Sequence, residues 1–356
     1  MAYDFLARFS DNSLATALGV SLGVVERVLA LWQQPHRFYH SDRIHLTQIF
    51  EQTDLLSDNY SRHEKEILEI AALFHDAVFF PGHTDNEERS AALFRDLIRG
   101  NLPEADEIEA MILDTKKRTS NAPLSPAFFK IDMYAKLYGS MSELFEYEHE
   151  IYREYQRSNY PEYKSRCLQF LDRLLPVEDI PGRHTIPHLK SYVEKRRPRI
   201  GLYPGTFAPF HIGHLSVLEK AEQIFDKVIV AVGINPEKDA SEHSIRLTET
   251  CNTLPFHEVI AFDGFLTDLV KTHEKYADIT IIRGLRNGND LDYEVNQLRF
   301  MEELYPDVRS IYLVCDKQYE HISSTAIRSL SKIDTAFAEK YKPVKYNYYH
   351  REYHHN

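Results

Sequence analysis

Cysteine and long apolar runs are scarce in this sequence, and each scarcity excludes a class of protein. The 356 residues include three cysteines, Cys167, Cys251 and Cys315, which are too few and too widely spaced for a disulfide framework or a cysteine-rich zinc site. No stretch of about 18 apolar residues occurs, so we expect no membrane span. The first residues lack a basic start followed by an apolar stretch and a small-residue cleavage site, so we expect no secretory signal and a cytoplasmic location.

Positive charge is also in deficit. Lys and Arg number 42 against 54 Asp and Glu, which gives a formal net charge of -12 and a pI near 5.8. This balance disfavours a general binder of polyanions, so we expect no nucleic-acid partner. It does not exclude a local basic pocket that binds phosphate. The composition, 43% hydrophobic and 27% charged, is that of a globular protein, and the length predicts two domains of roughly 150 to 180 residues.

The spacing of apolar residues divides the chain in two. Up to residue 175 they recur three and four positions apart, as in residues 67–74, which predicts an all-α domain over residues 1–175. Residues 176–198 contain four prolines and a basic cluster, so we expect a linker without continuous helix. Short apolar runs then alternate with helical segments, which predicts an α/β domain with a parallel sheet over residues 199–335. Residues 336–356 form a tail rich in Tyr and His, to which we assign no function.

Two histidines follow the first predicted strand of the C-terminal half. Residues 203–214 read YPGTFAPFHIGH and pass from a strand into a helix, so their amides and the helix N-terminus can face an anion. Thr206 offers a hydroxyl, and Gly213 between His211 and His214 lets a nucleotide lie close to the backbone. This pattern predicts a phosphate site.

Two further segments of this half favour phosphate binding. An apolar run ends in IRGLR, where Arg283 and Arg286 present guanidinium groups that match phosphate oxygens. Residues 321–328, HISSTAIR, supply three hydroxyls at the start of another helix. Taken alone, these serines are equally good candidates for helix N-caps.

Together these motifs resemble the nucleotidyltransferase superfamily with the HxGH signature, and within it most closely the bacterial phosphopantetheine adenylyltransferases. The similarity spans roughly residues 200–330 and includes, in family order, YPGTF, HIGHL, NPEK, FDGFLTDLV, IIRGLR, DLDYE and HISST. It implies a Rossmann-like fold that binds ATP, Mg²⁺ and a phosphorylated acceptor. It is also compatible with a homo-oligomer. It also implies catalytic roles for four residues of this chain, His214, Lys238, Arg286 and Thr206.

The resemblance assigns binding roles as well. It places ATP against Thr206, Phe207, His211, His214, Gly284, Leu285, Arg286, Glu294, Ile322, Ser323, Ser324 and Thr325. It places the acceptor against Thr206, Lys238, Leu266 and Arg283.

Three positions depart from the family pattern. Ala208 stands where the family has Asp, and Phe300 and Met301 stand where it has a Met-Asn pair. The motifs HIGHL and ISSTAIR also look like those of nicotinamide mononucleotide adenylyltransferases. In contrast, YPGTF and RGLR followed by DYE look like those of the pantetheine branch, and we give these motifs more weight. The acceptor is therefore expected to be phosphopantetheine, with nicotinamide mononucleotide or another phosphorylated molecule as the alternative.

In the N-terminal half, adjacent His75 and Asp76 interrupt an apolar helix face in the segment AALFHDA. A buried unpaired carboxylate is costly, so a metal ion or a strong partner is expected there, the alternative being a hydrogen-bonded pair without metal. Histidine and carboxylate together suit a divalent transition metal with positions left open for water. His40 or His45, and Asp132 much later in the chain, are the candidates that complete the ligand set.

These pieces resemble the HD phosphohydrolase superfamily, and more narrowly its predicted metal-dependent members. The match covers roughly residues 32–175 and includes PHRFYH, LFHDAVF, DNEERSA, ILDT, the Asp132 helix, EHEIYREYQ and RCLQFLDRLL. It implies an HD-type hydrolase that uses Mn²⁺, Co²⁺, Ni²⁺ or Fe²⁺. The candidate ligands are His40, His45, His75, Asp76 and Asp132.

Two details of this half bear on the metal site. His40 and His45 are five positions apart, which on an α-helix turns them about 140° from one another, so we expect only one of them in the site. Arg118 stands where relatives tend to have His.

Taken together, the two resemblances lead us to expect a bifunctional enzyme, an HD-type phosphohydrolase joined to an adenylyltransferase. The second hypothesis is that the HD domain senses a nucleotide without hydrolysis.

Overall fold

A computed structural model describes residues 3–56, 59–99, 102–137, 140–176, 183–233, 240–344 and 346. The chain forms two compact units. Unit 1 comprises residues 1–154 and 166–194, and unit 2 comprises residues 155–165 and 195–356. In the part of the chain that the structure describes, no helix is long and apolar enough to cross a membrane.

Unit 1 is helical in its described residues, which confirms the predicted all-α class. Its elements are α1 (Phe5–Ser10), α2 (Ser13–Leu18), α3 (Leu22–Trp32), the π-helix η1 (Asp42–Leu46), α4 (Thr47–Asp54), α5 (Arg62–His75), α6 (Asn86–Leu97), α7 (Pro103–Lys117), α8 (Ser125–Leu137), α9 (Met141–Glu154), α10 (Tyr160–Leu174), which begins in unit 2, and α11 (Ile186–Lys195). Helix α11 lies where we expected no continuous helix. Pro187 is tolerated there because it stands in the first turn, where a missing N–H removes no helical hydrogen bond.

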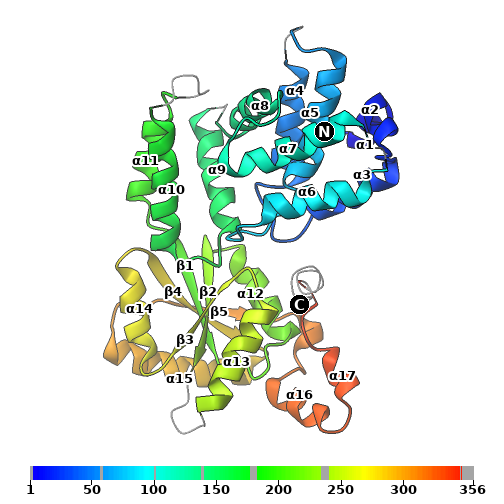
Figure 1. The fold of residues 1–356 in the computed structure, drawn as a ribbon. Helices are drawn as coiled ribbons and strands as arrows, with labels where there is room; N and C mark the ends of the chain where they lie inside the picture. Colours follow the sequence, from blue (N-terminus) through cyan, green and yellow to red (C-terminus); the bar gives the residue numbers. More distant parts are fainter. Residues whose placement is uncertain are drawn as a thin grey trace. The chain divides into compact units, whose positions relative to one another are not determined.

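Helix α5 runs through the centre of unit 1 (Figure 1). It starts at a capping box, in which the Ser61 side chain accepts from the N–H of Glu64 and the Glu64 side chain accepts from the N–H of Ser61. It packs against α2, α3, α4, α6 and α7, and every residue from Ile67 to His75 is buried. This packing places His75, the last residue of α5, inside the unit.

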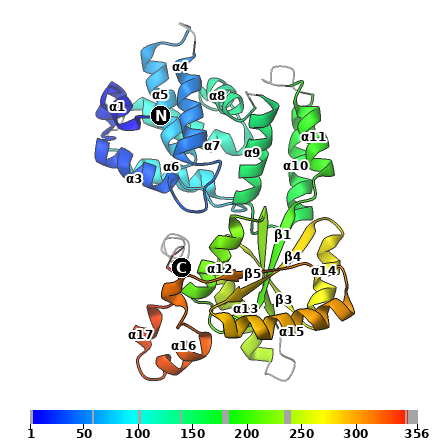
Figure 2. The ribbon, with the colours of Figure 1, turned by 180° about the vertical axis from the view of Figure 1, so that it is seen from behind.

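Unit 2 contains a five-stranded parallel sheet of order β3-β2-β1-β4-β5, which confirms the predicted α/β class. Its elements are β1 (Arg199–Gly205), α12 (Ile212–Glu222), β2 (Lys227–Gly233), α13 (Ala240–Thr253), β3 (Glu258–Phe262), α14 (Leu266–Glu274), β4 (Asp278–Leu285), α15 (Gly288–Leu304), β5 (Ser310–Val314), the 3-10 helix η2 (Lys317–Tyr319), α16 (Ser324–Ser331) and α17 (Thr335–Glu339). Helices α13 and α15 cover opposite faces of the sheet (Figures 1 and 2). Right-handed crossovers require this, because the connection through α13 leads towards one edge of the sheet, at β3, and the connection through α15 leads towards the other edge, at β5. The chain leaves β1 and β4 in opposite directions, so their carboxyl ends border the crevice where ligands bind in such sheets.

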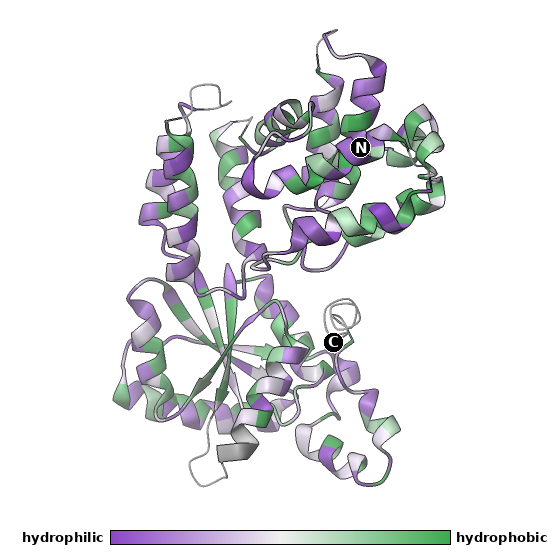
Figure 3. Ribbon diagram, viewed as in Figure 1, coloured by the Kyte–Doolittle hydropathy of each residue, from purple (hydrophilic) through white to green (hydrophobic). Residues whose placement is uncertain are grey.

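The sheet is apolar because its central strands are covered on both faces. On β1, Leu202 lies opposite Ile229 of β2 and Ile281 of β4, and all three are buried. The strands accordingly stand out as hydrophobic in Figure 3. This core fixes the two loops that follow β1 and β4.

Residues 155–165 belong to unit 2, and Lys227 at the start of β2 shows why. Its side chain donates to the carbonyl oxygens of Gln156 and Ser158, the latter at 2.6 Å, and pairs with Glu258 at 2.9 Å. Lys227 is only 1% exposed, so its charge depends on these partners. The expected boundary near residue 175 therefore differs from the observed division, because α10 starts in one unit and ends in the other.

Part of the expected tail is packed into unit 2. Helix α17 buries Ala338, and Tyr346 is buried against Phe256, with ring centroids 5.3 Å apart. Residues 345 and 347–356 lie outside the described residues. Unit 2 thus extends beyond the expected end at residue 335.

Candidate functional site

The turn between β1 and α12 supports the histidine motif. Phe207 adopts the left-handed conformation with φ 42°, and its ring packs so close to Gly205 that a Cβ there would lie 2.7 Å from it. Glycine is therefore required at position 205. The Phe207 ring also contacts His214 edge to face, with centroids 5.1 Å apart. Phe207 is thus a buried support, while Thr206 beside it is exposed.

His211 and His214 hold each other through the first turn of α12. The Nδ1 atom of each ring accepts a hydrogen bond from the backbone N–H of the other residue, both at 3.3 Å, and the rings stack 3.6 Å apart. Because each Nδ1 is an acceptor, each neutral imidazole carries its proton on Nε2. Gly213 permits this stack, since a Cβ there would lie 3.1 Å from the His211 ring. The motif therefore offers two Nε2–H donors.

Burial keeps both of these imidazoles uncharged. It lowers the pKa of His211 to about 4, with a further contribution from Arg286. It lowers the pKa of His214 well below the ordinary range, with smaller contributions from His211 and Arg286. At neutral pH the two rings donate hydrogen bonds without charge, so positive charge for a phosphate must come from other groups.

Arg286, directly after β4, supplies that charge. Its guanidinium makes two hydrogen bonds to Asp290 of α15, at 2.9 and 3.0 Å, and its backbone N–H donates to the same carboxylate at 2.9 Å. The hydrogen bond to Asp290 raises the pKa of Arg286 and fixes its orientation. Arg283, also expected to bind a ligand, instead pairs with Glu294.

The N-terminus of α16 faces the same region. Ser323 caps the helix by accepting from the N–H of Ala326 at 3.1 Å. Ser324 donates to the carbonyl oxygen of Pro209 at 3.0 Å, and Arg328 donates to the carbonyl oxygen of Ala208. Ala208 thus contributes its backbone to the link between α16 and the turn after β1.

These elements surround a cavity of about 430 Å³. Ten of the expected ATP-binding residues line it, namely His211, His214, Gly284, Leu285, Arg286, Glu294, Ile322, Ser323, Ser324 and Thr325. Among the described residues with expected ligand roles, Thr206, Phe207, Leu266 and Arg283 do not line it, and Lys238 lies outside the described residues.

Other lining residues were missed by sequence reasoning, namely Tyr203, Val217, Asp290, Tyr293 and Cys315. The spacing of Arg286 and Asp290, four residues apart across a helix start, was a signal for their ion pair. The aromatic and apolar residues had no such signal, because their exposure to the cavity depends on packing.

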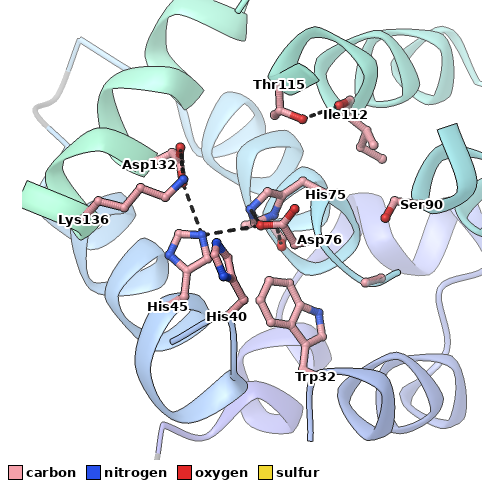
Figure 4. Close-up of polar contacts among 12 residues, drawn as sticks. Trp32, His40, His45, His75, Asp76, Ser90, Ile112, Thr115, Asp132 and Lys136 are labelled. Carbon is pink, nitrogen blue, oxygen red and sulfur yellow. Dashed lines mark hydrogen bonds and ion pairs between the residues drawn. The ribbon is translucent and has the colours of Figure 1, made fainter. Parts of the chain in front are cut away.

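In unit 1 the five expected metal ligands come together (Figure 4). His45 lies in η1, His75 and Asp76 at the end of α5, Asp132 in α8, and His40 before η1. One ligand atom from each of His45, His75 and Asp132 lies within 4.8 Å of the other two, and the same holds for His40, His45 and Asp76. Residues from distant parts of the chain thus form one cluster.

The Nδ1 atoms of His45 and His75 both act as donors. His75 Nδ1 donates to the carbonyl oxygen of Ala72 at 2.8 Å. The Tyr39 hydroxyl donates to Gln48 at 3.4 Å, so its oxygen accepts from Nδ1 of His45 at 3.2 Å. Each neutral ring then carries a lone pair on Nε2.

These two Nε2 atoms face carboxylates. His75 Nε2 lies 3.1 Å from Asp76 Oδ2, and His45 Nε2 lies 3.2 Å from Asp132 Oδ1. Despite these distances, both nitrogens and Asp132 Oδ1 are buried without a hydrogen-bond partner among the described residues. Lone pairs that face carboxylate oxygens repel one another unless a cation lies between them. The cluster therefore fits a divalent transition metal, for which imidazole and carboxylate are suitable ligands.

The charges of three of these groups, His45, Asp76 and Asp132, agree with this fit. Burial lowers the pKa of His45 to about 3. Burial opposes a charge on His75, but Asp76 raises the pKa of that ring. Burial also opposes ionised carboxylates, yet His75 lowers the pKa of Asp76 well below its ordinary range, and Lys136 lowers that of Asp132. The two carboxylates are thus ionised beside a neutral His45.

His40 lies at the edge of the cluster and is held by Glu154. Glu154 accepts hydrogen bonds from Nδ1 of His40 at 2.6 Å, from its N–H at 2.7 Å and from the N–H of Phe38 at 2.9 Å. His40 and His45 lie close together, although a spacing of five on a helix would turn them apart, because Ser41 is extended and His40 precedes the helix. The two rings meet edge to face, 5.3 Å apart.

Arg118 is the C-cap residue of α7. It ends α7 in the left-handed conformation, with its guanidinium 6.0 Å from the Phe170 ring. Glu154 and Lys136 were missed by sequence reasoning. A lone Glu or Lys on a helix gives no signal of its partner in three dimensions.

Comparisons with known proteins concern the C-terminal half. Residues 202–330 match the cytidylyltransferase-like family model. A phosphopantetheine adenylyltransferase of Clostridium perfringens is 38% identical over 143 residues, which cover 38% of this chain and 84% of that protein. Those of Clostridium tetani and Buchnera aphidicola are 33% and 34% identical, over 37% and 38% of this chain and 83% and 82% of the relatives. The solved structure of a proposed nicotinate-nucleotide adenylyltransferase from Vibrio parahaemolyticus aligns at 20% identity, covers 38% of this chain and 81% of that one, and gives a TM-score of 0.29.

Proposed function

Because the chain belongs, through its C-terminal unit, to the phosphopantetheine adenylyltransferase family, we propose that it transfers the adenylyl group of ATP to 4′-phosphopantetheine. The observation that carries this proposal is the cavity beyond β1 and β4. There His211 and His214, Arg286 and the hydroxyl-rich start of α16 line one space. These are the groups that a bound triphosphate needs.

The reaction requires positioning and charge neutralisation. A phosphate oxygen of the acceptor attacks the α-phosphorus of ATP, the bond to the β-phosphate oxygen breaks, and pyrophosphate leaves. His211 and His214 would donate from Nε2 to phosphate oxygens, and Arg286 would neutralise charge, with Mg²⁺ accompanying ATP. Lys238 and Arg283 are proposed for the acceptor phosphate, and Arg283 would exchange its partner Glu294 to reach it.

The residues at which this chain departs from the family pattern, namely Ala208, Phe300 and Met301, bear on the identity of the acceptor. Phe300 on α15 is 63% exposed and does not line the described cavity, so only an acceptor that extends along α15 would meet this aromatic ring. The test is pyrophosphate release from Mg·ATP with phosphopantetheine or nicotinamide mononucleotide, with the product identified by mass. Release with phosphopantetheine alone supports the proposal, release with nicotinamide mononucleotide alone replaces the acceptor, and no release with any acceptor refutes adenylyl transfer.

For unit 1 we propose a metal-dependent phosphohydrolase of the HD type. The observation that carries it is the convergence of two buried imidazole lone pairs and an unpartnered carboxylate oxygen. His45, His75, Asp76 and Asp132 would hold Mn²⁺, Co²⁺, Ni²⁺ or Fe²⁺, with His40 at the edge. Such an ion lowers the pKa of bound water and polarises a phosphate ester.

Metal content and phosphate release test this second proposal. One divalent ion per chain, together with phosphate release from nucleotides or phosphopantetheine, would support it. A chain that takes up no divalent ion, and whose His75→Ala and Asp76→Ala variants keep full adenylyl transfer, would favour the nucleotide sensor instead.

A further inference from the structure

The described end of the chain is attached to the helix that carries the two transferase histidines. Ile212, the first residue of α12, donates its backbone N–H to the carbonyl oxygen of Tyr341 at 3.0 Å. Ile212 stands between His211 and Gly213, so this bond is made within the HIGH motif. The first amides of a helix lack partners within the helix, and here a residue from the far end of the chain supplies one.

Side-chain packing reinforces the attachment. Ile322, Ile327 and Ala338 form a small buried cluster, against which Ile212 and Tyr341 pack. The Tyr341 ring lies 5.9 Å from the ring of Phe337 and 6.4 Å from that of His321. One cluster thus joins the start of α12 to the segment before α16, whose residues line the cavity.

The contact also sets which amides of α12 face a ligand. The N–H of Ile212 donates to Tyr341, that of His214 to Nδ1 of His211, and that of Leu215 to the carbonyl oxygen of His211. Within the described part of the chain, the Gly213 N–H is the amide of this turn that has no protein acceptor. Gly213 lines the cavity, so this amide is left for a ligand oxygen.

We propose that Tyr341 is a positioning residue for adenylyl transfer. Its carbonyl oxygen and ring hold the start of α12, so that the His211–His214 capping box forms and both Nε2–H groups are presented to the ligand. The inference rests on the proposed transfer reaction. Tyr341 lies beyond the match to the family model, which ends at residue 330.

Four variants of the full chain separate the contributions of the carbonyl and the ring. A stop after Lys340 removes both, Tyr341→Ala removes the ring alone, and Tyr341→Phe keeps both. A stop after Tyr346 removes only residues beyond these contacts and serves as the matched control. We expect kcat to fall about 100-fold for the stop after Lys340 and about 10-fold for Tyr341→Ala, with a smaller change in the KM for ATP. Tyr341→Phe should restore kcat to within about twofold of the wild-type value.

The tautomers of His211 and His214 distinguish positioning from a loss of stability. Their ring nitrogens can be followed by ¹⁵N NMR, with signals assigned by their loss in His211→Gln and His214→Gln. We expect Nε2–H tautomers in the wild type and in the Tyr346 stop, and a mixture with Nδ1–H in the Lys340 stop and Tyr341→Ala. A change that only destabilised the unit would leave the tautomers of the folded fraction intact.

Two outcomes overturn different statements. Wild-type kcat and tautomers in the Lys340 stop, or in Tyr341→Ala if the truncated chain does not fold, would overturn the role of Tyr341. Absence of pyrophosphate release by the wild type would overturn the transfer reaction, while the NMR comparison would still report whether Tyr341 positions the histidines.

Discussion

Each unit of this chain places a pair of histidines at its candidate site, and the two pairs carry their protons on opposite ring nitrogens. In unit 1, Nδ1 of His45 and of His75 donates to an oxygen, so Nε2 faces a carboxylate with a lone pair. In unit 2, Nδ1 of His211 and of His214 accepts from a backbone amide, so Nε2 carries the proton. The partner of Nδ1 thus prepares the same side chain for a cation in one unit and for an anion in the other.

The largest expected effect comes from breaking the pair in unit 1. His75→Ala removes one lone pair from the cluster, so we expect the affinity for Mn²⁺ or Co²⁺ to fall more than about 100-fold, beyond the effect of losing an outer-shell partner. Adenylyl transfer should not change. Equilibrium dialysis measures the affinity, and His63→Ala, an exposed position on the same helix, is the control. Equal affinity in His75→Ala and the wild type would contradict the metal site.

Breaking the pair in unit 2 should give the reciprocal result. His214→Ala removes a preorganised donor, so kcat for adenylyl transfer should fall by a factor on the order of 10² while metal affinity stays unchanged. Arg286→Ala should cost a similar factor. Steady-state pyrophosphate release measures both, with exposed Lys332→Ala as the control. Near-normal rates in both variants would contradict the assignment of this cavity as the site of adenylyl transfer.

A smaller effect is expected from a change of Asp290, which orients the charged Arg286 beside the histidine pair of unit 2. Asp290→Asn keeps the shape of the side chain but weakens its hydrogen bonds to Arg286, so we expect kcat/KM for ATP to fall about 10-fold. Asp268→Asn on α14 is a matched exposed control. If Asp290→Asn were as active as Asp268→Asn, the ion pair would have no part in holding Arg286.

The smallest effect is on stability at acid pH. The pKa of His211 is about 4 in the folded protein and about 6.5 when unfolded, so the unfolded state binds more protons between these values. The resulting stability is present above pH 6.5 and is lost as the pH falls towards 4, at up to about 1.4 kcal/mol per pH unit for one proton.

Thermal unfolding of unit 2 at several pH values checks this slope. His211→Asn keeps a good helix cap without a titrating ring, so its pH dependence should be shallower than that of the wild type. An added divalent ion should reduce acid sensitivity in unit 1 alone, because protons and metal compete for its imidazoles. The same slope in His211→Asn and the wild type would contradict the assignment to His211.

The sequence was sufficient for the class of each unit, since apolar spacing reflects local geometry. The buried face of α5 and the apolar run of β2 are each contained in one short segment. Part of each ligand cluster could be predicted from sequence motifs, as for His75 and Asp76, which are adjacent in the chain. Their partners His45 and Asp132 required the resemblance to a family, because no local pattern places them together.

The remaining features depend on packing between segments distant in the chain. The bond from Ile212 to Tyr341 and the hold of Glu154 on His40 involve a backbone oxygen and a carboxylate that carry no motif. Helix α11 formed where prolines suggested a linker, because the effect of Pro187 depends on its position within the helix.

The partners of Lys227 have a consequence for how this protein is made. Its carbonyl acceptors, Gln156 and Ser158, lie before the segment 166–194 that completes unit 1. During synthesis these acceptors therefore leave the ribosome before the strand that uses them, and unit 1 receives its last helices in between. No uninterrupted segment of the chain contains one unit alone, so expression of a separate transferase requires residues 155–165 to be supplied with it.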